Sequence, residues 1–246
     1  MTTTPDIRLY EEASLAGLPA LCTDGYDGWL LRFAKGHSRR ANSVAPLYPS
    51  TIDVGEKIRY CETAYARAGL RCVFKMTDAS TPHGLDDQLA DAGYQRDAET
   101  LVCTWQIAGN VVQPRRVELT ATPSADWLAT WSRLSERPDE GVFSQLLAAT
   151  PTAAAYVLIR HKGRGIACAR ATMSAGLVGL YDLLVAPGHR RQGLATDLTL
   201  ARLWWAQSQG VSRAFLQVMA GNTGAQTLQR RLGFAEIYRY WYRLQP

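Results

Sequence analysis

The segment from Val185 to Ala195 combines glycine, alanine and arginine where a predicted strand ends and a predicted helix begins. Backbone N–H groups in the first turn of a helix have no intrahelical acceptor, and the helix dipole adds partial positive charge there. Gly193 and Ala195 let a ligand approach the backbone closely, while Arg190 and Arg191 add full positive charges. The segment therefore predicts a binding site for a diphosphate.

Two other phosphate-binding loops do not fit this segment. The spacing from Gly188 to Gly193 matches the first part of a nucleotide-triphosphatase loop, which continues with Lys and then Ser or Thr. Here Leu194 and Ala195 stand in those places, so the lysine and the magnesium-binding hydroxyl are both missing. A dinucleotide-binding Gly-x-Gly-x-x-Gly is absent as well. A plain loop leading into a helix, with arginines exposed by chance, is the alternative interpretation.

Arg190-x-x-Gly193-x-Ala195, preceded by a strand that ends at Val185 and Pro187, resembles the pyrophosphate signature of the GNAT acetyltransferase superfamily. The resemblance covers most of residues 177–244 and continues at Leu216-Gln-Val218, Asn222, Ala225, Leu228 and Leu232-Gly-Phe234. It implies that acetyl-coenzyme A (acetyl-CoA) is the cofactor. The residues that it assigns to the pyrophosphate turn are Arg190, Arg191, Gln192, Gly193, Leu194 and Ala195.

The resemblance also implies that the strands around residues 183–185 and 216–218 diverge, with pantetheine between them. The backbone of Leu183, Leu184 and Val185 would then face pantetheine and the thioester carbonyl, an oxyanion-type role that needs no particular side chain. Asn222 is expected to contact the cofactor arm. A helix cap is the alternative role for Asn222, and the two roles are compatible.

Many family members carry a tyrosine at the position of Gln229, where it is thought to protonate the leaving thiolate. Gln229 stays in the expected cofactor site, but it cannot donate a proton at a useful pKa. Tyr238, Tyr240 and Tyr242 alternate on the last predicted strand, and Tyr238 is the favoured acid, with an aromatic core face as the alternative. Asp182, an acidic residue among leucines, is the expected base for the amine, with a structural carboxylate as the alternative.

We therefore expect direct transfer of an acetyl group to a primary amine of a small-molecule acceptor in a ternary complex. A non-catalytic acyl-CoA sensor is the first alternative, because Gln229 replaces the family's tyrosine. A nucleic-acid-binding protein is the second, because the net charge is +5 and the isoelectric point is near 9.0. The positive charges are not clustered, which disfavours a nucleic-acid surface. The protein is expected to be a monomer or a homodimer.

The second half of the chain carries the elements that position this chemistry. Leu194, Leu198, Ala201 and Trp205 recur at helical spacing and predict a helix over residues 190–209. A second helix is expected from the Asn222 cap to residue 232. Strands are expected at residues 117–121, 154–160, 165–173, 177–185, 214–218 and 235–244, and further helices at 125–135 and 141–149.

Residues 108–116 form a Gly- and Pro-containing break between two segments of similar size, which predicts a domain boundary. We expect a degenerate GNAT-like N-terminal domain at 1–110 and a catalytic GNAT domain at 115–246. Leu89-Ala-Asp-Ala-Gly-Tyr94 resembles the segment from Leu228 to Phe234, but no pyrophosphate motif precedes it. The fold class is therefore α/β (α+β), a tandem GNAT-like fold with a mixed central sheet flanked by helices.

The N-terminal half is expected to bind no cofactor and to line the substrate cleft. A hairpin from residues 29–34 and 41–45 around Gly36, helices at 54–68 and 85–92, and strands at 71–77 and 99–107 are predicted there. The polar residues expected to contact substrate are Arg39, Arg40, Asn42 and Ser43. A solvated charged turn is the alternative.

The composition is that of a globular protein, with 47% hydrophobic and 20% charged residues. The first five residues lack the basic and apolar regions of a signal peptide, and no apolar run approaches the ~20 residues of a membrane helix, so the expected compartment is the cytoplasm. Five scattered cysteines are expected to be reduced core residues. Neither the cysteines nor the four histidines have the spacing of a metal site.

Overall fold

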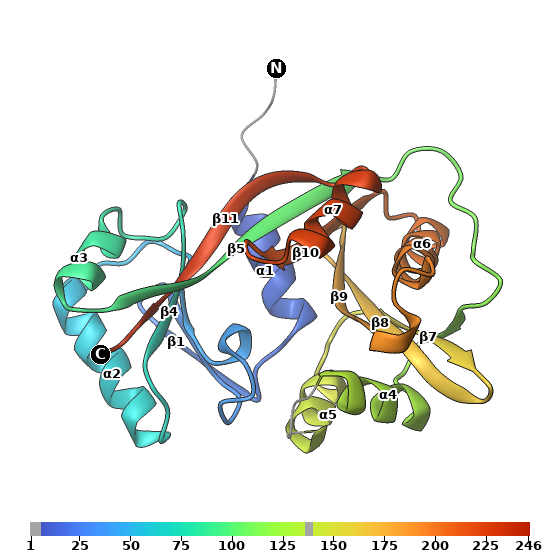
Figure 1. Cartoon of the computed structure of the whole chain (residues 1–246). Helices are drawn as coiled ribbons and strands as arrows, with labels where there is room; N and C mark the ends of the chain where they lie inside the picture. The colour runs from blue at the N-terminus through green and yellow to red at the C-terminus, as the bar shows by residue number, and fades with distance from the viewer. Residues whose placement is uncertain (1–5, 136–139) are drawn as a thin grey trace.

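A computed structural model describes residues 6–135 and 140–246 (Figure 1). The segment 1–5, on which part of the signal-peptide argument rests, lies outside these residues. The described part contains one mixed sheet of eleven strands in the order β1-β2-β3-β4-β11-β5-β10-β9-β8-β7-β6. Its strands are β1 (Cys22–Tyr26), β2 (Trp29–Phe33), β3 (Val44–Pro46), β4 (Val73–Thr77), β5 (Gln95–Gln106), β6 (Glu118–Thr120), β7 (Ala154–His161), β8 (Arg164–Ser174), β9 (Leu177–Val185), β10 (Arg213–Met219) and β11 (Ala235–Leu244).

The helices cover the two faces of this sheet. One face carries α2 (Val54–Arg67), α3 (Leu85–Asp91), α6 (Leu194–Ser208) and α7 (Thr223–Arg231). The other face carries α1 (Ile7–Gly17), α4 (Ala125–Ser135) and α5 (Glu140–Ala148). Two short 3₁₀ helices, η1 (Arg39–Ala41) and η2 (Pro187–His189), lie in connecting loops. No helix among the described residues is long and apolar enough to cross a membrane.

The sheet is built from two similar units that exchange their last strands. The order β3-α2-β4-α3-β5 in the first half recurs as β9-α6-β10-α7-β11 in the second. β5 lies between β10 and β11, and β11 lies between β4 and β5, so each unit ends with a strand inside the other (Figure 1). The tandem arrangement with a mixed sheet agrees with the expected fold class. The boundary between residues 110 and 115 stays a proposal, because both halves share one sheet.

The similarity between residues 89–94 and 228–234 corresponds to equivalent helix ends. The N–H of Tyr94 donates to the carbonyl of Leu89 at 2.9 Å after α3, and the N–H of Phe234 donates to that of Gln229 at 3.0 Å after α7. Gly93 lies between the first pair and has a positive φ, as does the glycine at 233. Such helix ends need a left-handed residue, which glycine supplies without steric cost.

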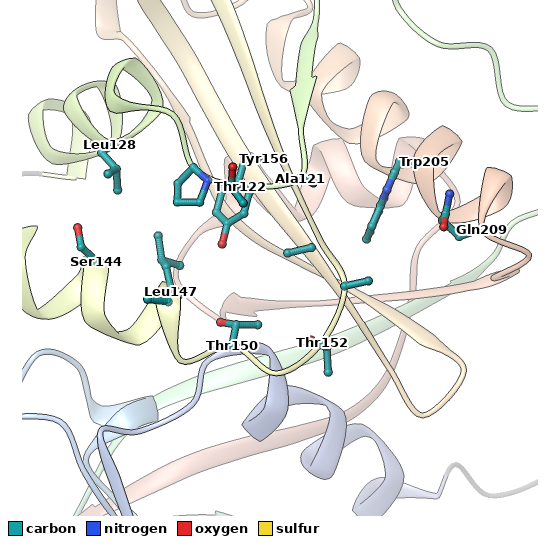
Figure 2. A pocket seen from close by; sticks show the side chains of 14 residues that line it. Ala121, Thr122, Leu128, Ser144, Leu147, Thr150, Thr152, Tyr156, Trp205 and Gln209 are labelled. Carbon is teal, nitrogen blue, oxygen red and sulfur yellow. The ribbon is translucent and has the colours of Figure 1, made fainter.

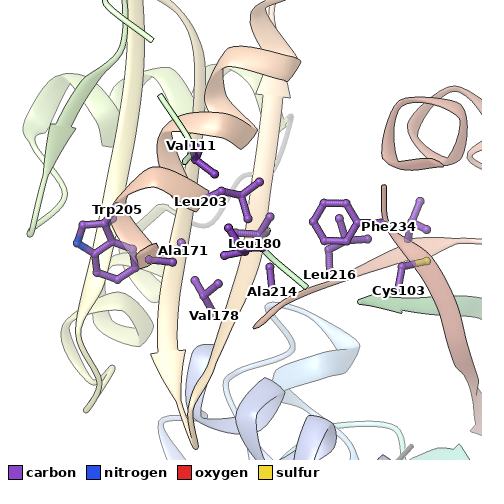
Figure 3. Close-up of a cluster of buried hydrophobic side chains, with 14 of the residues drawn as sticks. Cys103, Val111, Ala171, Val178, Leu180, Leu203, Trp205, Ala214, Leu216 and Phe234 are labelled. Atoms are coloured by element: carbon purple, nitrogen blue, oxygen red, sulfur yellow. The ribbon is translucent and has the colours of Figure 1, made fainter. Parts of the chain in front are cut away.

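The largest buried cluster holds α6 against the strands that carry the candidate site (Figure 3). Leu203 and Trp205 of α6 pack on Val178 and Leu180 of β9 and on Leu216 of β10. The four apolar residues whose spacing predicted this helix are all buried, and each buried leucine contributes about 1.5–3 kcal/mol. The position of α6 is therefore fixed by its apolar face.

Most predicted elements are confirmed, and three predictions need correction. The helix predicted from Arg190 begins at Leu194, because Gly193 at its N-cap has a φ of 77° and residues 190–193 form a turn. The predicted pairing of the strands around Gly36 is confirmed, but η1 interrupts their connection. Four cysteines are buried as expected, whereas Cys22 is exposed on the edge strand β1.

One α-helix and one strand, α1 and β1, are absent from the sequence prediction. α1 has an Asp6 cap, whose side chain accepts from the N–H of Leu9 at 3.2 Å. Its buried face includes Glu11 and Ser14, which weakens the apolar periodicity of a helix signal. β1 is almost entirely exposed, so it lacks the alternation of a half-buried strand.

Candidate functional site

The turn between β9 and α6 presents a run of unpaired backbone amides. Within the described part of the chain, the N–H groups of residues 191–196 make no hydrogen bond, and the first satisfied amide of α6 is that of Asp197, which donates to the carbonyl of Gly193 at 3.1 Å. Arg191 and Gly193 both have positive φ values, 63° and 77°. Alternation of left- and right-handed residues turns successive N–H groups to one side and makes an anion-binding concavity.

Cationic side chains surround this turn. The Nε of Arg190 donates to the carbonyl of Val185 at 3.3 Å, which holds the end of β9 to the turn. Arg191 is exposed. Arg116 donates from Nη2 to the carbonyl of Gln192 at 3.1 Å and pairs with Asp197, so it neutralises the acidic residue in the first turn of α6. A Cβ on Gly193 would lie 3.4 Å from Nη2 of Arg116, an ordinary contact distance, so glycine is favoured here by its positive φ of 77° and not by lack of space. Sequence reasoning missed Arg116, because nothing local marks a residue so distant along the chain.

A pocket of about 470 Å³ adjoins the same turn. Its lining includes Arg116, Gly188, His189, Gln192 and Leu194. A larger and mainly apolar pocket of about 670 Å³ lies elsewhere, between α4, α5 and the end of α6, where Leu128, Leu147, Tyr156, Trp205 and Gln209 line it (Figure 2). The polar and charged side chains therefore line the smaller pocket beside the turn, whereas the larger pocket is mainly apolar.

The strands β9 and β10 separate beyond their first four residues. They pair in parallel from Arg213 opposite Leu177 to Leu216 opposite Leu180. Beyond these residues β9 continues to Val185 and β10 to Met219, and the two strands no longer pair with each other. β9 stays paired with β8 up to Val185. The divergence that the sequence predicted is thus present, and the edge of residues 183–185 that faces β10 has no strand partner in the described part of the chain.

A bulge at Asp182 marks the start of this separation. Asp182 has a φ of 52°, and the pairing register of β8 and β9 shifts at this point. Two buried arginines hold the bulge. Arg170 pairs with Asp182 at 2.5 Å and donates to the carbonyl of Gly17 at 2.6 Å. Arg202 of α6 donates to the carbonyls of Arg170 and Tyr181 at 3.1 and 3.2 Å, and burial lowers the pKa of Arg202 to about 9.

The two predicted catalytic residues lie in different hydrogen-bond networks. Asp182 is at the mouth of the gap, with its side chain 10% exposed and paired with Arg170. Tyr238 is buried in β11, where its hydroxyl donates to Oε1 of Glu11 at 2.9 Å. Burial and the Glu11 charge raise the pKa of Tyr238. These contacts favour the alternative role of Tyr238 in an aromatic core face, because its proton is held by a buried carboxylate.

Two predicted cofactor residues lie on α7. Asn222 caps this helix, and its side chain accepts from the N–H of Ala225 at 3.1 Å. The Oε1 atom of Gln229 is buried and has no hydrogen-bond partner among the described residues. A buried amide oxygen without a donor is costly. Gln229 is therefore suited to accept an N–H group from a ligand, such as an amide of pantetheine.

The four predicted substrate contacts of the N-terminal half differ in their surroundings. The Asn42 side chain accepts from the N–H groups of Ala34 and Gly36 at 2.7 and 3.0 Å, and it donates to the carbonyl of Ser38 at 2.8 Å. Its polar atoms thus hold the loop together. Ser43 is 1% exposed. The contacts of Asn42 and the burial of Ser43 favour a structural role within the loop over contact with a substrate.

The two arginines of η1 point to different places. Arg39 is exposed and pairs with Asp97 at 2.6 Å. Arg40 is partly buried and donates from Nη1 to Oε1 of Gln217 at 3.3 Å. Gln217 is the first residue of β10 beyond its pairing with β9. Of the four predicted contacts, Arg40 is thus the one that the structure brings to the gap between the strands.

Comparisons with known proteins agree with this geometry. A family described as "Probable histone acetyltransferase Rv0428c C-terminal" matches residues 4–243. The chain is 29% identical to the uncharacterized N-acetyltransferase YobR of Bacillus subtilis (strain 168) over 248 residues, which cover 98% of this chain and 99% of that protein.

Solved structures show the same fold. The GCN5-related N-acetyltransferase from Kribbella flavida superposes with a TM-score of 0.73 at 20% identity, over 99% of this chain and 97% of that one. A tandem GNAT protein from the clavulanic acid biosynthesis pathway superposes with a TM-score of 0.61 at 15% identity, over 78% of this chain and 70% of that one. These likenesses confirm the tandem GNAT fold.

Proposed function

The chain belongs to the Rv0428c C-terminal acetyltransferase family and is a GNAT-type N-acetyltransferase, and from that premise we propose that it transfers acetyl from acetyl-CoA to a primary amine of a small-molecule acceptor. The transfer proceeds by direct attack in a ternary complex, and no covalent enzyme intermediate forms. The observation that carries the proposal is the run of six unpaired amides at residues 191–196, at the end of a strand whose edge is open.

The residues around the turn and the gap fit the cofactor. The amides of residues 191–196 would hold the diphosphate, with Arg191 adding charge from the exposed side. The open edge at residues 183–185 offers backbone N–H and carbonyl groups to the pantetheine arm, and Gln229 offers its unpartnered oxygen. Asn222 supports this wall as the cap of α7.

The chemistry of the bound donor is that of a thioester with an activated acetyl carbonyl. The chain contributes orientation, exclusion of water and a proton acceptor. Backbone N–H groups near Leu183 and Leu184 would stabilise charge on the carbonyl oxygen. We keep Asp182 as the proposed acceptor of the amine proton, because Arg170 fixes its carboxylate at the mouth of the gap.

No side chain is assigned to protonate the leaving thiolate. Tyr238 is engaged by Glu11, and Gln229 has no acidic proton. An ordinary thiol has a pKa of about 8.5, so a thiolate is a good leaving group near neutral pH without an acid. The absence of the family's tyrosine is therefore compatible with turnover.

Binding and turnover test the proposal with one matched pair of variants. Gly193 and Gly210 flank α6 and have φ values of 77° and 79°, so alanine costs similar backbone strain at both. We expect Gly193→Ala to weaken acetyl-CoA binding in calorimetry about tenfold or more, because relief of the strain at a φ of 77° shifts the unpaired amides of the turn. Gly210→Ala should bind normally, because nothing lies within 4 Å of its Cβ.

The same proteins are then assayed for thiol release with a panel of amines. Turnover on at least one amine, lost in parallel with binding in Gly193→Ala, supports the proposal. Tight binding of acetyl-CoA without turnover on any amine would instead identify a sensor. Failure of the wild-type protein to bind acetyl-CoA would refute the cofactor site.

A further inference from the structure

The layer between α1 and the sheet is unusually rich in charged side chains. We call it the polar layer, and its members are Glu11, Arg32, Arg40, Lys75, Arg170 and Asp182. Glu11, Arg32, Lys75 and Arg170 are each no more than 4% exposed. Charged groups are rarely buried to this extent unless each is paired. The pairing of each member is therefore informative.

Two ion pairs account for four of the six charges. Lys75 pairs with Glu11, which also accepts from the hydroxyl of Tyr238. Arg170 pairs with Asp182. Among the described residues Arg32 has no carboxylate partner, and it donates instead to backbone carbonyls, including that of Leu18 after the end of α1. Arg40 has a neutral amide, that of Gln217, as its hydrogen-bond partner. The polar layer thus carries two positive charges in excess.

Arg40 is the excess charge that lies at the gap. Its partner Gln217 is on the β10 side of the gap and donates from Nε2 to the hydroxyl of Ser14 at 2.8 Å. Burial disfavours the cation, but attraction to Tyr240 and to Asp182 on the β9 side outweighs it, so the pKa of Arg40 is raised. Arg40 therefore stays charged between the two diverging strands.

This position is on the acceptor side of the proposed reaction. α6 and its anion-binding turn belong to one face of the sheet. Arg40, Ser14 and the Arg170–Asp182 pair lie on the opposite face with α1. If the acetyl donor is held by the turn before α6, the opposite face, which α1 covers, is the side from which the amine approaches. An amine beside Asp182 therefore also lies beside Arg40.

One donor of Arg170 in this layer has no acceptor in the described chain. The Nη2 atom of Arg170 is buried and makes no hydrogen bond within the described residues, although Arg170 is 0% exposed. An unsatisfied guanidinium N–H in the interior is destabilising unless a ligand or water accepts it. The polar layer thus combines an excess of positive charge with an unused donor.

Resting on the proposed function, we propose that the acceptor amine carries a carboxylate, which Arg40 binds on the α1 side of the gap. A carboxylate matches the planar guanidinium in geometry and replaces a neutral partner by a charged one. It also neutralises part of the excess charge of the polar layer. Cationic acceptors, such as a lysine side chain in a basic peptide, are disfavoured by the same charge.

Matched acceptor pairs test this proposal. Thiol release is measured for several amino acids of different size and for their primary amides, which differ only in the carboxylate, and for a basic lysine peptide. We expect kcat/KM to be about tenfold or more higher for at least one acid than for its amide, since ten-fold corresponds to about 1.4 kcal/mol, the range of a partly buried charge-assisted hydrogen bond. Higher kcat/KM for every amide, or for the lysine peptide, would overturn the proposal.

Variants locate the effect at Arg40. Arg40→Gln should lower kcat/KM about tenfold for the preferred acid and less than about threefold for its amide. Arg40→Lys, which keeps the charge, should retain part of the preference. Arg59→Gln, on the exposed side of α2, is the control for an arginine removed from the same half. An equal loss for acid and amide in Arg40→Gln would show that Arg40 only positions Gln217.

Failure of this inference is distinguishable from failure of the proposed function. Acetyl-CoA binding by calorimetry, with thermal melting as a check of folding, reports on the cofactor site in every variant. If no amine is turned over, the proposed transfer fails. The carboxylate site is then tested by direct binding of the same amino acids to the CoA-loaded wild type and to Arg40→Gln. Equal affinity, or no binding by the wild type, would overturn it.

Discussion

The starts of α2 and α6 occupy equivalent places in the two units. The backbone amides before α2 are bound by carboxylates of the chain, whereas those before α6 are unpaired among the described residues. Before α2, the carboxylate of Asp27 accepts from the N–H groups of Thr51 and Ile52 at 2.9 Å each. The side chain of Asp53 caps the helix and accepts from the N–H of Glu56 at 3.0 Å. Before α6, the corresponding loop contains glycine and arginine, and its amides at residues 191–196 are unpaired.

In the N-terminal unit the chain thus supplies its own anion. Asp27 also pairs with Lys57 at 3.3 Å, and the backbone N–H of Ile52 is the main reason that the pKa of Asp27 falls to about 2. The C-terminal unit keeps the amides and cations and omits the carboxylate. The same framework is therefore closed by one acidic side chain in one unit, whereas in the other it presents unpaired amides, where we propose that a diphosphate binds.

The largest expected effect comes from making the second unit resemble the first. Gly193→Asp places a carboxylate at the N-cap of α6, where it competes for the amides and repels phosphate. We expect acetyl-CoA affinity to fall about 100-fold or more, and calorimetry measures it. Gly193→Asn is the matched control, because asparagine tolerates a left-handed backbone and has no charge. Similar losses in both variants would show that shape, and not charge, keeps the site open.

The reverse change weakens the closed loop of the first unit. The pKa of Asp27 is lowered from 3.8 to about 2, so its carboxylate stabilises the fold above about pH 4, and this contribution is lost as the pH falls toward 2. We expect Asp27→Asn to have a lower Tm than the wild type near neutral pH. The difference should shrink between pH 4 and pH 2. A difference independent of pH in thermal melting would contradict the comparison.

A variant of Tyr238 tests whether this residue of β11 stabilises the fold through Glu11 or takes part in catalysis. β11 is the last strand of the second unit, but the hydroxyl of Tyr238 binds Glu11 in the ion pair with Lys75. We expect Tyr238→Phe to reduce the free energy of unfolding by about 2 kcal/mol, the value of a hydrogen bond to a charged group. Chemical denaturation measures this change. The pH profile of kcat/KM should not move, and a lost basic limb would return Tyr238 to a catalytic role.

The smallest expected effect concerns the exposed charge at the open turn. Arg191→Gln should weaken acetyl-CoA binding about three- to tenfold at low salt and less at high salt, because exposed charges are screened. Affinity is measured over a series of salt concentrations, with Arg164→Gln, an exposed arginine of the β7–β8 hairpin, as the control. A loss that is independent of salt would mean that Arg191 shapes the turn instead of contributing charge.

Local sequence predicted the elements that bury a regular apolar stripe or end in glycine. The strand ending at Val185, the apolar face of α6 and the Asn222 cap are examples, and all three are found in the structure. α1 was missed because Glu11 and Ser14 belong to its buried face. The start of α6 was placed too early because a turn of left-handed residues leaves no apolar pattern to mark it.

The open turn follows from residues that are adjacent along the chain. Gly193 has no side chain to cap the helix, and two arginines lie close to it in the sequence. Because these features are local, a sequence motif can reveal them. The proposed acceptor side exists only in the folded chain. Asp182, Arg170, Gln217 and Arg40 come from four separate elements, which meet because β9 and β10 diverge and α1 covers the opposite face. Their pairing depends on burial and distance, and neither is a property of residues near one another along the chain.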